Sequence, residues 1–543
     1  ADKVTTTTMT YDAINRLSTE QNSLGNTTSY RYDNRGNKTS ETDALGNVTL
    51  YIHDGMNRLL EERRLLSPEG IGSGGLDVFN PVNSDGGIST FYEYDKNNRL
   101  SRLTDDNGND TVYGYDDLNR ETSISYADGS QVIKTYDADG NMVSKTDQNG
   151  TVNTYSYDAL NRLTAIEATL AEGVVGSNAW RYTYDGLGRR TQLTDNNDPA
   201  VVGDDSTVQL RYNSLNQLIS ETSHGRTIQV EYDGLGNRQS LRYPNGRQIN
   251  YSYDNVYNLK AISEQSNQSI VASFNYAGIG RVLNRTYGNG TVLNMVTGLP
   301  DSTDSGYDAI NRIVEIQHND SQGTRISGFN YVYDKANNSR YEIDQFTQMA
   351  DVYEYDSAYR LIRAAYQVPA SEPEIQDLEN NNNVNADVAT VQAANDVTWL
   401  LDGVGNWVSE QTLSPASSDA VGYITTNMNE YSRIGPQEQQ HDNNGNLIAD
   451  GERFYHYDGR NRLVRVTTLA GNTVAYYQYD ALNRRSKKAA ANEVVQYHYF
   501  GKQVLEERNA LGQMQRQFVY GTRLDQVLQM KTAANDYYYH ANR

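Results

Sequence analysis

A Tyr-Asp dipeptide recurs along this chain at a nearly constant interval, and this repeat constrains the fold more than any other feature. Tyr94, Tyr115, Tyr136 and Tyr157 each begin a copy, and each lies 21 residues after the one before. A fixed period of this size is typical of repeat proteins, in which each unit packs mainly against its neighbours. Such arrays usually serve as scaffolds, surfaces or containers, so we expect a structural role before a catalytic one.

Each copy predicts a β-hairpin. Tyr-x-Tyr often precedes the turn, as at Tyr155 and Tyr157, and this alternation places both rings on one face of a strand. The following Asp and Gly or Asn form turns, because Asp bonds its own backbone and Gly or Asn accepts positive φ. An Arg often follows, and we expect it to bond the motif Asp. We assign the structural repeat motif to Tyr11, Asp12, Tyr32, Asp33, Tyr94, Asp95, Tyr115, Asp116, Tyr157, Asp158, Tyr457, Asp458, Tyr479 and Asp480.

The number of units predicts the overall architecture. Roughly twenty units would give about forty short strands, whereas flat open sheets rarely exceed about ten. Because strands twist with a fixed hand, so long a ribbon must curl. We therefore predict an all-β fold with little helix, in which a Tyr-Asp β-hairpin ribbon coils into a spiral, solenoid-like hollow shell. The 43 Tyr, against 8 Phe and 3 Trp, suit a thin wall that is wetted on both faces.

The repeat extends over the whole chain, so residues 1–543 are predicted as a single shell segment. Two stretches interrupt it. Residues 65–90 are rich in Gly, Pro and Ser, and residues 367–396 are rich in Asn and acidic residues, so both predict surface loops. A coiled strip also has two ends, and we expect open strand edges near Tyr11 and near Tyr537–Tyr539.

Composition excludes several classes of function. The 69 Asp and Glu outnumber the 47 Lys and Arg, and a net charge of −22 would repel nucleic-acid phosphates. The absence of cysteine excludes disulfides, thiolate metal sites and a cysteine nucleophile. No apolar run approaches the roughly 20 residues that span a bilayer, and the first residues do not read as a signal peptide.

The sequence carries no recognisable catalytic or metal-binding pattern. The seven His residues show no paired ligand spacing and are interpreted as structural residues on strands. The turn that begins at Asp137 partly matches a calcium loop, but Met142 and Gln148 stand where that loop needs Gly and Glu. We therefore predict no catalytic residues, no metal site and no cofactor.

These motifs resemble the Rhs/YD-repeat family, which includes Tc toxin C components, type VI Rhs effectors, wall-associated contact toxins and teneurins. The resemblance covers nearly the whole chain. It is strongest over residues 400–543, which look like the approach to the family's core-closing region, in segments such as LLDGVGNW (400–407), YHYDGRNRLV (455–464) and YQYDALNRR (477–485).

The resemblance implies a hollow β-shell that, in toxin members, encloses a variable C-terminal toxic domain, often released by aspartyl self-cleavage at an Asp-Pro-x-Gly type motif. Asp198-Pro199 lacks that context, and no toxin domain precedes Arg543. We therefore expect part of a shell, without self-cleavage or toxicity of its own.

We read the chain as a non-enzymatic wall of a secreted bacterial protein, outside the cell or on its surface, that encapsulates or presents a toxin domain. An extracellular adhesion or filament-forming protein is a second hypothesis, and a polysaccharide-binding or polysaccharide-active protein a third. Expected partners are an enclosed polypeptide or another copy joined through open strand edges, with a cell-surface glycan or protein also open. The reading frame beyond Arg543 would distinguish the first two hypotheses.

Overall fold

The computed structural model describes residues 5–66, 86–201, 203–278, 280–295, 306–371, 393–414, 417–491, 493–523 and 525–540. In these ranges every regular element is a β-strand, and the strands number 46. The prediction of an all-β fold is therefore confirmed.

The strands form an antiparallel meander in which nearly every strand pairs with the next along the chain. The meander is divided once among the described strands. Strands β1 (Thr7–Tyr11) to β35 (Gln437–Glu438) form one sheet, and β36 (Gln440–His441) to β46 (Asp536–Tyr538) form a second. Only Gln439 separates the two sheets in sequence.

A bulge beside the motif Tyr recurs in the hairpins. In β13 (Val152–Tyr157) and β14 (Leu163–Thr169), the pairing register shifts between Ser156 and Tyr157. The same shift precedes Tyr11, Tyr94 and Tyr479 in their hairpins. Because a bulge bends its strand and increases the local twist, a bulge in each unit curls the ribbon steadily.

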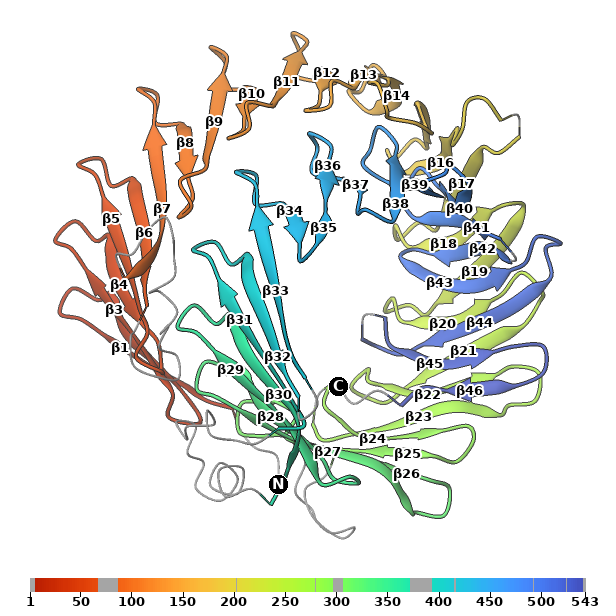
Figure 1. The fold of residues 1–543 in the computed structure, drawn as a ribbon. Helices are drawn as coiled ribbons and strands as arrows, with labels where there is room; N and C mark the ends of the chain where they lie inside the picture. Colours follow the sequence, from red (N-terminus) through yellow and green to blue (C-terminus); the bar gives the residue numbers. More distant parts are fainter. Residues whose placement is uncertain are drawn as a thin grey trace.

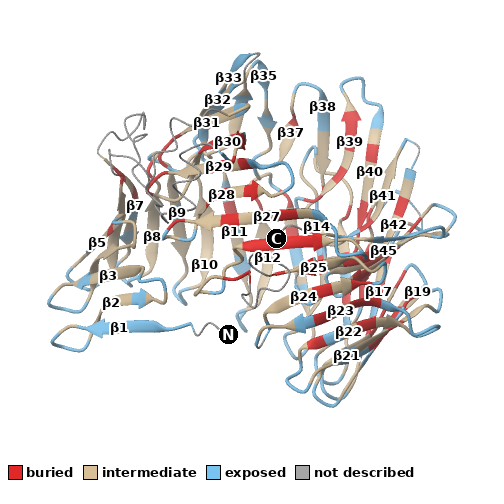
Figure 2. Cartoon of the chain, turned by 90° about the horizontal axis from the view of Figure 1, so that it is seen from below, coloured by how far each residue is buried: buried red, intermediate tan, exposed pale blue. Residues whose placement is uncertain are grey.

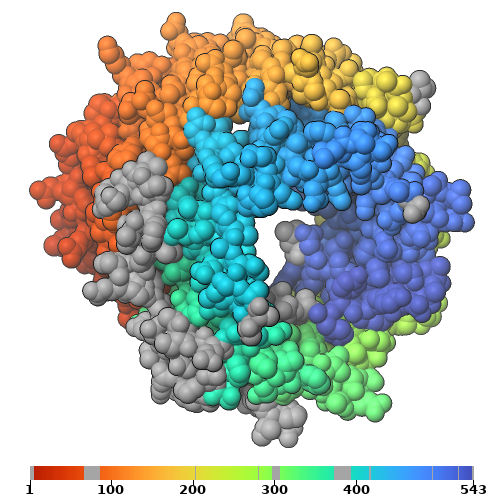
Figure 3. All heavy atoms as spheres, viewed as in Figure 1, coloured from red at the N-terminus to blue at the C-terminus, as the bar shows by residue number. Residues whose placement is uncertain are grey.

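The ribbon coils into a spiral around an open centre, as Figures 1 and 3 show. We call residues 5–295 the first winding and residues 306–540 the second winding. Thr5 Oγ1 donates to the backbone oxygen of Ala309 at 3.2 Å, where the second winding begins to pass the first. Asn149 Nδ2 donates to Asp442 at 2.9 Å farther along. The predicted curled shell is thus built from two stacked turns of ribbon.

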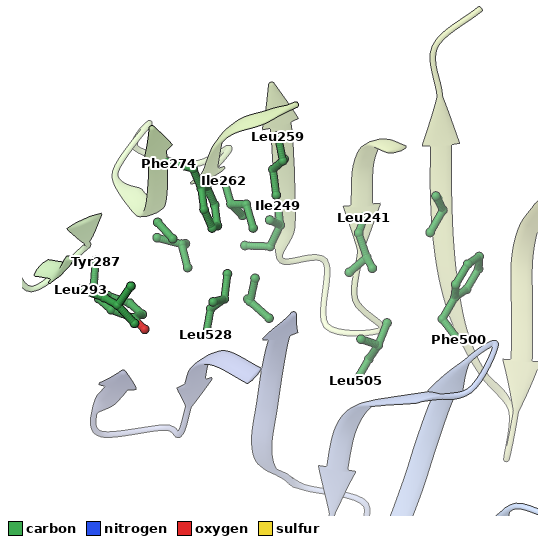
Figure 4. Packing of buried hydrophobic residues seen from close by; sticks show 14 of the residues in the cluster. Leu241, Ile249, Leu259, Ile262, Phe274, Tyr287, Leu293, Phe500, Leu505 and Leu528 are labelled. Atoms are coloured by element: carbon green, nitrogen blue, oxygen red, sulfur yellow. The ribbon is translucent and has the colours of Figure 1, made fainter. Parts of the chain in front are cut away.

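The apolar core lies where the two windings overlap. In Figure 4, Leu241, Ile249 and Ile262 of the first winding face Leu505 and Leu528 of the second. These five side chains are at most 2% exposed. Figure 2 shows that buried residues concentrate in this half of the molecule, whereas the strands near the N-terminus are mainly half-buried or exposed. The wall is therefore a single layer in one part and a packed double layer in the other.

Both predicted loops are shorter than the sequence indicated, as far as the structure describes their ends. Leu65 closes β6 (Leu59–Leu65) and Gly87 opens β7 (Gly87–Tyr94). Similarly, the end of β30 (Leu361–Pro369) and the beginning of β31 (Asn395–Leu401) lie inside the range predicted for the second loop. The paired strands extend into segments whose composition is typical of loops, and composition alone does not reveal this extension. Residues 67–85 and 372–392 lie outside the described ranges.

Of the two predicted open edges, the one at β1 is present, whereas the one near Tyr537–Tyr539 is partly covered, because the Tyr287 hydroxyl of the first winding donates to the backbone oxygen of Tyr539 at 2.6 Å. Among the described strands, β1 pairs with β2 (Leu17–Asn22) alone, and all five of its residues are exposed. At the other end, β46 pairs only with β45 (Val527–Lys531). Tyr11, Tyr537 and Tyr539 expose 54%, 47% and 40% of their surface, so each edge carries accessible aromatic rings.

Candidate functional site: the repeat turn and the seam between windings

The motif Asp organises the turn that follows it. Oδ1 of Asp158 accepts hydrogen bonds from the backbone N–H groups of Leu160 and Arg162, at 2.9 and 3.0 Å. Oδ2 accepts from Nε of Arg162 at 2.7 Å. Asn161 has a φ of 57°, which Asn tolerates better than most residues. A single carboxylate therefore closes the turn and binds the Arg that ends it.

The other predicted motif residues have the same geometry. Asp33 differs only in that its partner is Asn37, whose Nδ2 donates at 2.8 Å. An Arg four residues later donates Nε to the carboxylate of Asp12, Asp95, Asp116, Asp458 and Asp480. The predicted residues thus form a ladder along the ribbon and do not converge on one point.

The Arg of one repeat also holds the next repeat. The guanidinium of Arg99 lies 4.6 Å from the ring centre of Tyr115, and its NH1 donates to the backbone oxygen of Asp116 at 2.9 Å. The Tyr115 hydroxyl in turn donates to the backbone oxygen of Leu100 at 2.9 Å. Because a cation over an aromatic face is attracted to it, each turn clamps its neighbour. An Arg lies over Tyr32, Tyr94 and Tyr479 in the same way.

Three motif tyrosines lie outside this Arg contact. The Tyr157 hydroxyl donates to the backbone oxygen of Met142, and Asn141 replaces the preceding Arg. Tyr11 donates to the sulfur of Met9 at the open edge. The backbone oxygen of Tyr457 accepts from Val175 of the first winding at 2.9 Å, so this Tyr lies at the contact between windings.

The electrostatic setting of the motif Asp changes between the two windings. In the first winding, backbone N–H and Arg hydrogen bonds hold the pKa of Asp12, Asp95, Asp116 and Asp158 below its usual value. For Asp33 the side chain of Asn37 is the main cause of a lowered pKa. In the second winding, burial raises the pKa of Asp458 despite its contact with Arg462. The same turn therefore lies in water on one winding and in the interior on the other.

A buried ion-pair cluster joins the windings at this point. The guanidinium of Arg462 lies 2.6 Å from its own Asp458 and 2.8 Å from Asp195 of the first winding. Asp195 is further held by Nε1 of Trp180 at 2.6 Å and by the hydroxyl of Ser177 at 2.5 Å. The carboxylates of Asp195 and Asp458 therefore each accept from several donors, as a buried charge requires.

The next repeat of the second winding uses the same arrangement. Arg484 lies 2.6 Å from Asp480 and 2.6 Å from Glu221 of the first winding. The backbone N–H of Gly501 donates to the other oxygen of Glu221 at 2.9 Å. Burial raises the pKa of Glu221, and the nearby Arg484 opposes that effect. We call the line of such contacts between the windings the seam.

Sequence reasoning missed the first-winding half of the seam. Asp195, Glu221 and Trp180 lie outside the Tyr-Asp motif, so the repeat pattern gave no reason to select them. Tyr359 was also missed. It occupies the turn position where other repeats carry Asn or Gly, with a φ of 64°, and its hydroxyl contacts the carboxylate of Asp43. An aromatic residue at that position was the one available signal.

Four of the seven His residues pack against one another in pairs. His498 packs edge-on against His224, with ring centres 5.8 Å apart, and Nδ1 lies 3.4 Å from the hydroxyl of Ser223. Burial, with His224 and Arg508 nearby, lowers the pKa of His498 to about 3, so the ring is neutral at physiological pH. His540 lies against His318, with 3.0 Å between their Nδ1 atoms.

Within the described ranges, no cluster of three or more His, Asp or Glu side chains is placed to hold a metal ion. The turn at Asp137 is a hairpin turn, in which Asn141 donates both its backbone N–H and its Nδ2 to the carboxylate. The described part of the chain also contains no helix with the length and apolarity needed to cross a membrane.

The RHS repeat family model matches four segments of the chain, residues 11–48, 94–131, 136–175 and 212–248. The chain is 29% identical over 149 residues to a tRNA3(Ser)-specific nuclease WapA of Bacillus spizizenii and 28% identical over 149 residues to the tRNA nuclease WapA of Bacillus subtilis. Each match covers 27% of this chain and 6% of the relative, so the chain spans only a small part of these proteins.

The fold is similar to solved structures of Tc toxins. A Photorhabdus luminescens Tc holotoxin pore matches over 94% of this chain and 27% of that chain, with 16% identity and a TM-score of 0.69. A TcdB2–TccC3 structure matches over 95% of this chain and 33% of that chain, with 14% identity and a TM-score of 0.57. At these identities the likeness establishes the fold.

Proposed function

We propose that this RHS/YD-repeat protein forms part of the wall of a hollow shell that encloses a polypeptide, and that the wall itself catalyses no reaction. The observation that carries the proposal is the seam. Buried ion pairs such as Arg462–Asp195 join neighbouring windings side by side. A coiled ribbon without lateral contacts would leave a slot between its turns, whereas joined windings make a continuous wall around the open centre seen in Figure 3.

The comparisons support a toxin-related cargo. The relatives that match part of the chain are named as nucleases, and the structures with a similar fold belong to Tc toxins. The share of those proteins that the chain matches is small, so we assign any toxic activity to a region outside the match. Export from a bacterial cell, with action outside it or at its surface, is part of the same proposal.

Protease protection tests the enclosure. We suggest fusing the same unfolded reporter segment either after Arg543 or before Ala1 and digesting each purified fusion. Strand β1 lies at an exposed edge, whereas His540 contacts His318 within the wall. We expect the reporter at the C-terminus to be digested much more slowly. Equal digestion of the two reporters would reject enclosure while leaving the fold intact.

The absence of catalysis needs a separate assay. Because the relatives are named as tRNA nucleases, purified chain should be incubated with total tRNA and the products resolved on a gel. We expect intact tRNA at every protein concentration. Cleavage that co-purifies with the chain through two chromatographic steps would contradict a purely structural wall.

A further inference from the structure

The hexapeptide YDALNR occurs twice, at residues 157–162 and 479–484, in two different environments. On the first winding, Leu160 exposes 72% of its surface. On the second winding, the equivalent Leu482 packs against a buried cluster of the first winding that includes Trp180 and Leu193. The adjacent Ala481 is only 5% exposed. The same six residues are therefore free in one copy and docked in the other.

A second identical pair shows the same difference. YDAINR occupies residues 11–16 and 307–312. Ile14 is 67% exposed, whereas Ile310 is half-buried. The turn around Ile310 contacts the first winding, because Thr5 accepts from Asn311 at 3.0 Å and donates to Ala309 at 3.2 Å. The same turn sequence therefore docks against another winding in one of its two copies.

The free copies form a regular row. In the first winding, the tip of each Tyr-Asp turn is the third residue after the motif Tyr or after the His that replaces it. This residue is often a large, exposed aliphatic one. We call this row the apolar rim. Six of its members, between 61% and 74% exposed, are Met56, Leu118, Leu160, Leu187, Leu215 and Leu235. The rim therefore presents apolar side chains at the repeat spacing along one edge of the ribbon.

We propose that the apolar rim binds the second winding of another copy of this chain. Each winding has two rows of turns, one that follows the motif Tyr and one on the opposite side of the ribbon. In the seam, the Tyr-Asp turns of the second winding meet the opposite turns of the first: Asn26 Nδ2 donates to the backbone oxygen of Lys335, in the turn after Tyr333-Asp334, at 3.4 Å. Among the described residues, this pairing leaves two rows largely uncovered, the rim of the first winding and the opposite row of the second winding. One turn of the opposite row is contacted, since Arg226 of the first winding donates to the backbone oxygen of Gly512 at 3.3 Å.

The spacing of the rim identifies a ribbon of the same repeat as its partner. One hairpin is two strands wide, so neighbouring tips lie about 10 Å apart. A partner that meets many tips must have the same spacing, which another winding supplies. In its opposite row, the second winding exposes Phe346 by 70% and Leu469 by 58%. These apolar side chains are suited to meet the aliphatic tips of the rim.

Charge on the two rows is complementary as well. Two docked turns place their Arg against a carboxylate of the first winding, Arg462 with Asp195 and Arg484 with Glu221. Arg162 and Arg189 hold the equivalent places on the rim. The opposite row of the second winding carries Asp344 and Asp450 in its turns. Two copies would therefore stack end to end, with different surfaces in contact, so that the lumen of one continues into the next.

Sedimentation velocity across a concentration series tests the proposal. We expect the weight-average sedimentation coefficient of the natural chain to rise with concentration. The triple variant Leu118→Ser, Leu160→Ser, Leu187→Ser should stay monomeric and keep its circular dichroism and thermal midpoint, because these side chains are mostly exposed. The control Ile52→Thr, Ile133→Thr alters exposed residues on the face of the same winding and should associate normally.

Mixing identifies the two surfaces. The variant Phe346→Ser, Leu469→Ser should also be monomeric alone. When mixed with the triple rim variant, it should form a complex of two chains, since each partner retains the surface that the other lacks. A natural chain that sediments as one species at all concentrations overturns the proposal. So does a rim variant that associates normally, or a mixture that forms no complex.

Discussion

Arg462 of the second winding and Asp195 of the first form an ion pair of 2.8 Å in which both side chains are almost fully buried. Arg462 also bonds Asp458 of its own turn at 2.6 Å. One guanidinium therefore completes a repeat and joins two windings. This double use explains how a structure with few apolar residues stacks its turns: the side chains that build each hairpin also supply the lateral contact.

Arg462→Met should strongly destabilise the protein. The substitution leaves Asp195 and Asp458 buried without their cation, and removing one partner of a buried pair typically costs about 3–5 kcal/mol. The control is Arg162→Met, at the same turn position of the first winding, where Arg162 and Asp158 expose 28% and 24% of their side chains. Urea unfolding should show a clear loss for the first variant and a small one for the second. Equal losses would mean that the seam contributes little.

Tyr257 and Tyr359 should respond to the same substitution in opposite directions. Both occupy the turn position with positive φ, at 65° and 64°. Replacing Tyr257 by Asn should stabilise the protein by roughly 1 kcal/mol, because the left-handed conformation is costly for most side chains, and its ring is 59% exposed. Tyr359→Asn should destabilise, because it removes the contacts with Asp43 and Arg64 across the seam. Thermal midpoints measure both, and a shared direction would refute this assignment.

Arg340→Met should raise stability. Arg340 is 0% exposed, and none of its three guanidinium nitrogens has a hydrogen-bond partner among the described residues. Burial lowers its pKa, although Glu354 and Asp334 oppose the shift. Those two carboxylates already bond Arg363 and Asn338 and would stay paired. Removing an unsatisfied buried group should therefore add about 1–3 kcal/mol. A fall in the urea midpoint would show that the charge is compensated.

His498 should make the packing of the two windings sensitive to acid. Its pKa is lowered from 6.5 to about 3 by burial, by His224 and by nearby Arg508 and Arg226. Between these values the unfolded chain binds a proton that the folded chain does not, so stability falls as pH falls. The stability that depends on an unprotonated His498 is fully present above about pH 6.5 and is lost as the pH falls towards 3.

His498→Gln tests this dependence. Gln cannot be protonated. As the pH is lowered from about 6 to 4.5, the unfolding free energy of the variant should therefore fall less steeply than that of the natural chain. The motif Asp residues of the first winding have pKa values lowered from 3.8, and their contribution is lost only as pH falls below about that value. They therefore titrate mainly below the chosen window. The same slope in both proteins would remove His498 as the cause.

Much of the hairpin could be predicted from the sequence alone. The 21-residue interval, the alternation of Tyr and the turn residues after Asp are all local signals, because a turn and its two strands are neighbours in the chain. The bond between Asp158 and Arg162 spans four residues and follows from the motif itself. The curling of the ribbon was also predictable, although the bulge beside Tyr157 that drives it was not.

Only the tertiary structure decided which copies of the motif meet a second winding. Leu160 and Leu482 have the same six-residue context, yet one is exposed and the other is docked. The difference depends on how far the ribbon turns per repeat, which sums small twists over hundreds of residues and so brings Asp195 opposite Arg462. A repeated sequence specifies the unit and its contact with the next unit, whereas the accumulated rotation determines which distant units become neighbours.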